Sequence, residues 1–106
     1  MRTINLGKSD LCVPVIAVGC MRINRLEKRE AERFVQTALD VGANFFDHAD
    51  IYGDGECELI FADAIHMNAA VREKIILQSK CGIRKGISFD FSKEQILRSV
   101  DGILKR

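Results

Sequence analysis

The sequence predicts an α/β fold built on a parallel sheet, because short apolar runs alternate with amphipathic helical segments. Three runs of strand length lie at residues 15–18, 44–47 and 75–79, and each is followed by a segment with helical periodicity. Strands that are joined by helices lie parallel, with right-handed crossovers. We therefore expect a strand followed by a helix, three times in succession, within a single domain of 106 residues.

The first elements are a hairpin and a covered strand. Residues 3–6 and 12–13 flank the turn-rich tetrapeptide GKSD at 7–10, which favours an antiparallel pair. Residues 15–18 (VIAV) then form a continuous apolar run that ends at Gly19. Such a run is typical of a parallel strand covered on both faces.

Three helices follow from apolar residues at i, i+3, i+4 and i+7. The first is expected from Lys28 to Gly42, with its buried stripe at Ala31, Phe34, Val35, Ala38 and Leu39. The second carries the same spacing at Cys57, Ile60, Phe61, Ala64 and Ile65. The third begins at Ser92, because Gln95 completes a capping-box pattern, and its stripe is Ile96, Val100, Ile103 and Leu104.

Polar side chains interrupt the ends of the second and third strands. Asp47 ends one apolar run and Lys80 follows the next, so parallel neighbours would bring the two charges together. Gln78 and Lys80 share one strand face, which suggests a functional interior; the alternative is that Lys80 extends from the strand end into water. An ammonium beside a phenol favours phenolate and would make Tyr52 a usable proton donor, as carbonyl reduction requires.

Residues 47–53 (DHADIYG) and 79–81 (SKC) resemble the aldo-keto reductases, in particular a bacterial oxidoreductase branch. The resemblance continues through residues 6–11 (LGKSDL) and 16–21 (IAVGCM) to the last helix. It implies a (β/α)8 TIM barrel, of which this chain would be the N-terminal part. Residues 1–14 would then be a hairpin cap, and residues 15–106 the first three βα units.

The resemblance also implies an activity, which is the reduction of an aldehyde or ketone by NADPH or, less favoured, NADH. Tyr52 would be the general acid, Lys80 would favour its phenolate, and Asp47 would pair with Lys80. The family's fourth catalytic residue, a histidine or asparagine, follows a later strand. Met21 and Arg22 would lie beside the nicotinamide with Asp47 near its ribose, and no metal is expected. The chain has no G-x-G-x-x-G motif, in agreement with a barrel reductase.

Two other functions stay open. The acidic loop with Asp47, His48 and Asp50 could bind a metal in a TIM-barrel hydrolase, or the chain could be a non-catalytic remnant or interaction module. A barrel needs about 250 residues, so 106 residues cannot close one from a single copy. We expect an N-terminal fragment that is inactive alone, or a chain that self-associates through unpaired sheet edges.

Composition argues against some classes of binding partner and indicates a cellular compartment. The chain is 47% hydrophobic and 29% charged with a net charge of +1, which gives no electrostatic case for nucleic acid or an anionic membrane. Four dispersed cysteines and the lack of an apolar signal segment indicate the cytoplasm. We expect buried cysteines, with a redox pair of Cys20 and Cys81 as the alternative.

Two loops are expected to have no catalytic role. Residues 53–56 (GDGE) form a turn that leads into the second helix, where Glu56 and Glu58 would lie near the positive end of the helix dipole. Residues 84–86 (RKG) are expected to be a solvated basic loop.

Overall fold

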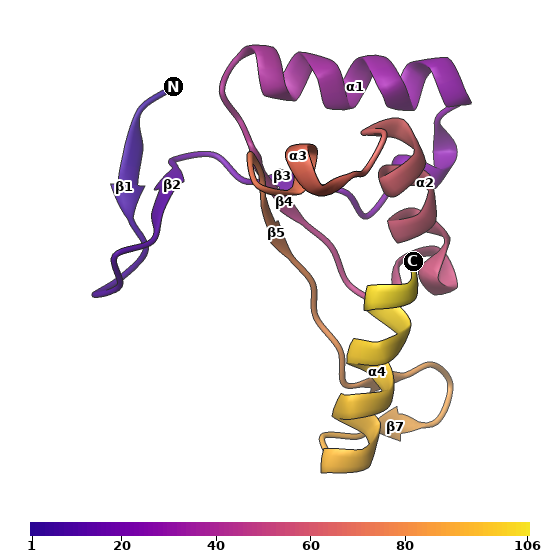
Figure 1. The fold of residues 1–106 in the computed structure, drawn as a ribbon. Coiled ribbons are helices and arrows are strands. Elements are labelled where there is room, and N and C mark those ends of the chain that lie inside the picture. Colours follow the sequence, from indigo (N-terminus) through magenta and orange to yellow (C-terminus); the bar gives the residue numbers. More distant parts are fainter.

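In the computed structural model, which describes residues 1–106, three parallel strands form one sheet (Figure 1). Strands β3 (Val18–Gly19), β4 (Phe45–Asp47) and β5 (Ile76–Gln78) lie in that order. Gly19, Asp47 and Gln78 are aligned across it. The predicted parallel α/β arrangement is confirmed, and the three strands form an open sheet and not a closed barrel.

The N-terminal hairpin is confirmed, but the first strand of the sheet is shorter than predicted. Strands β1 (Thr3–Asn5) and β2 (Cys12–Pro14) pair antiparallel and stand apart from the sheet in Figure 1. Only Val18 and Gly19 pair with β4, and the Ile16 side chain before them is 57% exposed. The expectation of a strand covered on both faces was wrong, because residues 15–17 connect the hairpin to the sheet without strand pairing.

The first two predicted helices are confirmed and enclose the core with the sheet. A 3-10 turn η1 (Ile23–Arg25) leads to α1 (Lys28–Asp40), and a second, η2 (Tyr52–Gly55), leads to α2 (Glu56–Ala64). The core joins residues from α1, α2 and the strands, including Ala31, Val35, Ala38, Phe46, Cys57, Phe61 and Ala64. The rings of Phe46 and Phe61 lie 4.8 Å apart, so β4 is packed directly on α2.

One short helix was not predicted. Helix α3 (Ala69–Arg72) lies between α2 and β5, and the Asn68 side chain accepts a hydrogen bond from the Val71 amide at 3.0 Å. A single capped turn has too few residues to show helical periodicity, so the sequence pattern does not reveal it.

The last helix begins as predicted but does not bury its apolar stripe. Helix α4 (Lys93–Lys105) starts at Ser92, whose hydroxyl accepts from the Gln95 amide at 3.3 Å. The side chains of Ile96, Val100 and Leu104 are 39%, 41% and 79% exposed, because α4 lies apart from α1 and beyond the end of the sheet (Figure 1). The periodicity therefore predicted a helix correctly and its burial wrongly.

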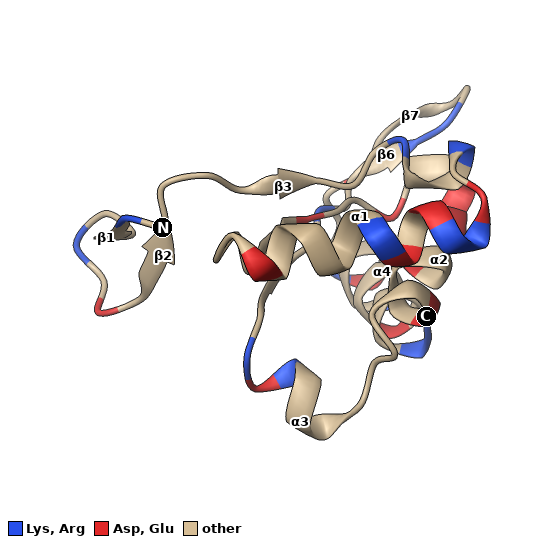
Figure 2. Ribbon diagram, turned by 90° about the horizontal axis from the view of Figure 1, so that it is seen from above, with Lys and Arg blue, Asp and Glu red and all other residues tan.

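A second hairpin replaces the expected basic loop. Strands β6 (Ile83–Arg84) and β7 (Ser88–Phe89) pair antiparallel before α4. Acidic and basic residues are mixed along α1 and α4, whereas α2 carries acidic residues only (Figure 2). None of the helices is both long and apolar enough to cross a membrane.

Candidate active site

The ends of β4 and β5 bring three polar side chains together. The Lys80 Nζ donates to Asp47 Oδ1 at 2.7 Å and to the His48 carbonyl oxygen at 2.6 Å. The Gln78 Nε2 donates to the same Asp47 oxygen at 2.5 Å. The predicted meeting of Asp47 and Lys80 is therefore confirmed, and Gln78 joins them because it lies opposite Asp47 in the sheet register.

The Lys80 ammonium is held in its charged form. Partial burial lowers the pKa of Lys80, but its interactions with Asp47 and Tyr52 raise that pKa by more, so it lies above its usual value. The Lys80 Nζ lies 5.1 Å from the centre of the Tyr52 ring. The Lys80 side chain is 45% exposed, so it reaches the solvent and the carboxylate together.

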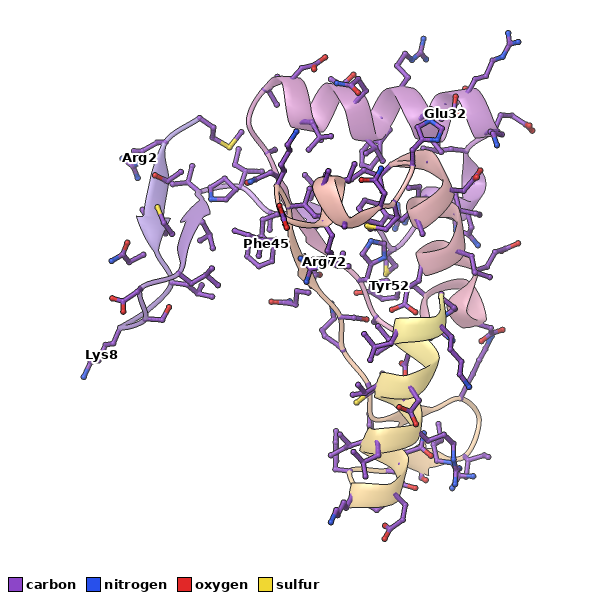
Figure 3. All side chains as sticks on the ribbon, viewed as in Figure 1. Arg2, Lys8, Glu32, Phe45, Tyr52 and Arg72 are labelled. Carbon is purple, nitrogen blue, oxygen red and sulfur yellow. The ribbon has the colours of Figure 1, made fainter.

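The loop that carries Tyr52 is held by one hydrogen bond to the segment that follows β5 and by one within the loop. The Asp50 amide donates to the Lys80 carbonyl oxygen at 3.0 Å, and the Tyr52 amide donates to the Ala49 carbonyl oxygen at 3.0 Å. Gly53 and Asp54 then adopt left-handed φ angles of 57° and 53°, which turn the chain into α2. In the view of Figure 3, Tyr52 lies between the end of β5 and α2. The main-chain conformation of this loop therefore determines the position of the Tyr52 side chain.

Met21 and Arg22 follow β3 at the same edge of the sheet. The Cys20 amide donates to the Asp47 carbonyl oxygen at 3.0 Å, which ties this segment to the end of β4. Both side chains are exposed, with Met21 50% exposed. The two donors to Asp47 reach Oδ1, so Oδ2 faces no side-chain donor. The thioether of Met21 could contact an apolar ring, and the guanidinium of Arg22 could bind a phosphate. The Oδ2 atom of Asp47 could accept a hydrogen bond from a sugar hydroxyl.

The metal-site alternative is not supported by the side-chain arrangement. His48 follows Asp47 on the strand end, so its side chain points to the opposite face. Its ring is 2% exposed and packs edge-on against Phe61, with ring centres 4.6 Å apart. Across the chain, no cluster of three or more His, Cys, Asp or Glu side chains has a geometry suited to a metal ion. Asp47, His48 and Asp50 therefore do not act together.

Two buried titratable side chains, His48 and Glu58, lie on the face of the sheet opposite the Asp47–Lys80 pair. Burial acts first on His48. It lowers the pKa of His48, against the opposing attraction of Glu58, so the imidazole is neutral at pH 7. Glu58 is 7% exposed and accepts from the Ser79 hydroxyl at 2.6 Å and from Arg106 Nε at 2.7 Å. The prediction that Glu58 lies near the positive end of the helix dipole did not include these two hydrogen bonds. The available signal was its spacing, since Glu58 precedes Phe61 by three positions on one helix face.

The prediction of buried cysteines is confirmed for Cys20 and Cys57 and is wrong for Cys12, which is exposed, and for Cys81, which is partly exposed. Burial raises the pKa of the Cys20 thiol to about 12, with smaller contributions from the charge of Asp47 and from Cys57. A thiol of that kind is protonated and unreactive at neutral pH, so a redox pair with Cys81 is not supported. In the loop expected to lack a role, the Lys85 Nζ lies 3.1 Å from Asp54 Oδ2 and links β6 and β7 to the Tyr52 loop.

Comparison with known proteins gives a consistent result. The model of the aldo/keto reductase family matches residues 15–106. A 6-dehydroglucose reductase of Novosphingobium aromaticivorans is 35% identical over 95% of this chain and 36% of its own length. An aldo-keto reductase structure from Bacillus halodurans, in its holo form, superposes with a TM-score of 0.83 at 32% identity, covering 99% of this chain and 36% of that one. The chain thus spans about a third of the length of the curated relatives it matches.

Proposed function

Because the chain belongs to the aldo/keto reductase family of oxidoreductases, we propose that it supplies the proton-donating part of an active site that reduces an aldehyde or ketone. The observation that supports this most directly is the position of the Lys80 Nζ, 2.7 Å from Asp47 Oδ1 and 5.1 Å from the Tyr52 ring centre. A charged amine at this position can stabilise the negative charge that develops on the phenol oxygen during proton transfer.

The three side chains have distinct roles in this proposal. As hydride adds to the carbonyl carbon, charge develops on the carbonyl oxygen, and Tyr52 donates its proton to that oxygen. Lys80 stabilises the phenolate that remains. Asp47 acts through Lys80, because its carboxylate keeps the ammonium charged and fixed in position. The product is the corresponding alcohol.

We further propose that Met21, Arg22 and Asp47 hold the nicotinamide end of the cofactor. When bound, a reduced nicotinamide cofactor supplies the hydride, and the family resemblance favours NADPH over NADH. The support from this chain is the exposed side chains of Met21 and Arg22 and the unpartnered Oδ2 of Asp47 at one edge of the sheet. A small-molecule carbonyl compound is the proposed substrate.

The 106-residue chain alone is proposed to be inactive. Its hairpin, residues 1–14, would cap the barrel, and residues 15–106 would supply three of its βα units. The outer strands β3 and β5 each pair on one side only, so the site lacks an opposite wall, and self-association through these edges is the proposed alternative way to cover them. Four free cysteines are in keeping with a reducing cytoplasm.

The test uses a chimera that supplies the rest of a barrel. Residues 1–106 would replace the matching segment of the Bacillus halodurans reductase, and NADPH oxidation with an aromatic aldehyde would be followed. We expect Tyr52→Phe and Lys80→Met to lower turnover by roughly 10²- to 10⁴-fold, the usual contribution of general acid catalysis. Lys85→Met is the matched control, because it removes an ammonium from an exposed ion pair and should leave turnover within about twofold.

The outcomes separate the proposed functions. Full activity in Tyr52→Phe would refute the assignment of the proton donor. A folded chimera without activity would favour the non-catalytic interaction module. Activity of the 106-residue chain itself would refute the proposal that it is inactive alone, and it would then be compared with the oligomeric state from sedimentation.

A further inference from the structure

Gln78 lies at the end of β5, on the strand face that carries Lys80, and the proposed reduction gives it no role. Its partner in the sheet register is Asp47, the last residue of β4. Side chains of residues that are aligned on neighbouring strands point to the same face of the sheet. The pairing of β4 with β5 therefore places the Gln78 amide within reach of the Asp47 carboxylate.

The contact between Gln78 and Asp47 involves only one of the two carboxylate oxygens. Gln78 Nε2 donates to Asp47 Oδ1 at 2.5 Å, and Lys80 Nζ donates to the same oxygen at 2.7 Å. Oδ2 accepts no hydrogen bond from the chain. Gln78 is exposed, so water could satisfy its amide, yet the amide lies on Asp47. Two donors thus hold one side of the carboxylate and leave its other oxygen open.

Lys80 has a second anchor, which does not depend on the Asp47 side chain. Its Nζ donates at 2.6 Å to the His48 carbonyl oxygen, which belongs to the main chain just after β4. The ammonium therefore stays in place if the Asp47 side chain turns. Without the Gln78 amide, the carboxylate could turn until both its oxygens face the ammonium, because a cation attracts both. The amide opposes this turn, since the turn would break a charge-assisted hydrogen bond.

We propose that Gln78 is a positioning residue that orients the Asp47 carboxylate, so that Oδ1 binds Lys80 and Oδ2 stays free to accept from a ribose hydroxyl of the cofactor. The inference rests on the proposed function, in which Asp47 takes part in holding the cofactor. Gln78 touches neither the cofactor nor the reacting atoms, and it acts through Asp47 alone. Its loss should therefore affect cofactor binding more than turnover.

The first test measures cofactor affinity without turnover. Gln78→Met keeps the length of the side chain and removes the donor. Gln36→Met is the matched control, because Gln36 Nε2 donates to Asp40 Oδ1 at 2.7 Å on the exposed face of α1. Both are made in the chimera with the Bacillus halodurans reductase, and calorimetry with NADP+ gives the Kd. We expect Gln78→Met to raise the Kd by about 3- to 10-fold, as for partial loss of one hydrogen bond to a charged group, and Gln36→Met to change it by less than about 1.5-fold.

A double-mutant cycle tests whether Gln78 acts through Asp47. In an Asp47→Ala background, Gln78→Met should change the Kd for NADP+ by less than about 1.5-fold, because the carboxylate that Gln78 orients is gone. Turnover at saturating NADPH should fall much less in Gln78→Met than in Lys80→Met, because Asp47 stays paired with Lys80. A residue that only supports the fold would instead lower turnover and the melting temperature together.

A second readout uses the 106-residue chain without cofactor. Partial burial lowers the pKa of Lys80, but Asp47 and Tyr52 raise it above its usual value. If loss of the Gln78 amide gives the ammonium both carboxylate oxygens, less of Lys80 is in the free-amine form that acetic anhydride modifies. At about pH 9 we expect Lys80 to be acetylated about two- to threefold more slowly in Gln78→Met, relative to Lys85 in the same molecule. Gln36→Met should leave this ratio unchanged.

Three results would overturn the inference. One is a Kd for NADP+ in Gln78→Met within about 1.5-fold of that of the parent chimera. Another is an equal rise of the Kd in the Asp47→Ala background, which would mean that Gln78 contacts the cofactor itself. The third is faster acetylation of Lys80 in Gln78→Met, which would mean that the site has loosened. Failure of the proposed function is distinct, because it would appear as full turnover in Tyr52→Phe, and the acetylation ratio decides whether Gln78 orients Asp47 even if the chimera binds no NADP+.

Discussion

Replacing Arg106 with methionine would test the buried contact that joins three elements. Glu58 on α2 accepts hydrogen bonds from Ser79 after β5 and from Arg106 at the end of α4. Without Arg106, a carboxylate that is 7% exposed keeps only the hydroxyl partner. Breaking a buried ion pair from one side costs about 3–5 kcal/mol, and a charged hydrogen bond contributes about 1.5–3. Since Arg106 is 24% exposed and Ser79 stays, we expect a loss of about 2–3 kcal/mol.

Urea unfolding followed by circular dichroism measures this loss. With an m-value of roughly 1–1.5 kcal/mol/M, the midpoint should fall by about 2 M, or the variant should be unfolded without urea. The double variant Glu58→Leu with Arg106→Met should recover much of the loss, because it leaves no buried charge. A loss below about 0.5 kcal/mol for Arg106→Met would show that the contact behaves as an exposed ion pair and would refute the reasoning.

Two further predictions concern pH and backbone strain. Burial lowers the pKa of His48 below its usual 6.5, so at acid pH the unfolded chain takes up a proton that the folded chain excludes. The free energy of unfolding should therefore decrease as pH drops below about 6.5. The urea midpoint should fall between about pH 7 and pH 5, and it should fall by less in His48→Phe than in the unaltered protein. A pH dependence identical in the two proteins would contradict this. Gly82 has a φ of +117°, and a Cβ there would overlap Phe91, so Gly82→Ala should lower the free energy of unfolding by at least about 1–2 kcal/mol. Gly86 has a φ of +72° in open space, so Gly86→Ala should lower it by less. Equal urea midpoints for the two variants would refute the difference.

The sequence predicted most of the secondary structure and the central contact of the site. Ser92 and Gln95 marked the start of α4, and the apolar spacing marked α1 and α2. Asp47 and Lys80 were expected to meet because each lies at the end of a parallel strand, and the structure confirms the contact. Catalytic and cofactor roles for these residues stay predictions that the chimera would test.

The errors have a common physical cause. Apolar stripes were read as buried, yet Ile16 before β3 and Leu104 on α4 are exposed because no neighbouring element covers them. Glu58 was interpreted from its place near a helix end, although its partners, Ser79 and Arg106, are distant in the sequence. A helical period reports which residues share a face, and it does not report what lies against that face.

The sequence by itself therefore determined the order of strands and helices, their main starts and ends, and the two strand ends that carry Asp47 and Lys80. These features depend on side-chain periodicity, capping and turn residues, which act over a few positions. Only the tertiary structure decided that His48 is buried against Phe61, that Glu58 is buried with Ser79 and Arg106, and that α4 leaves its stripe exposed. The physical reason is that burial and pairing are set by side chains far apart in the sequence, which only the packed chain brings together.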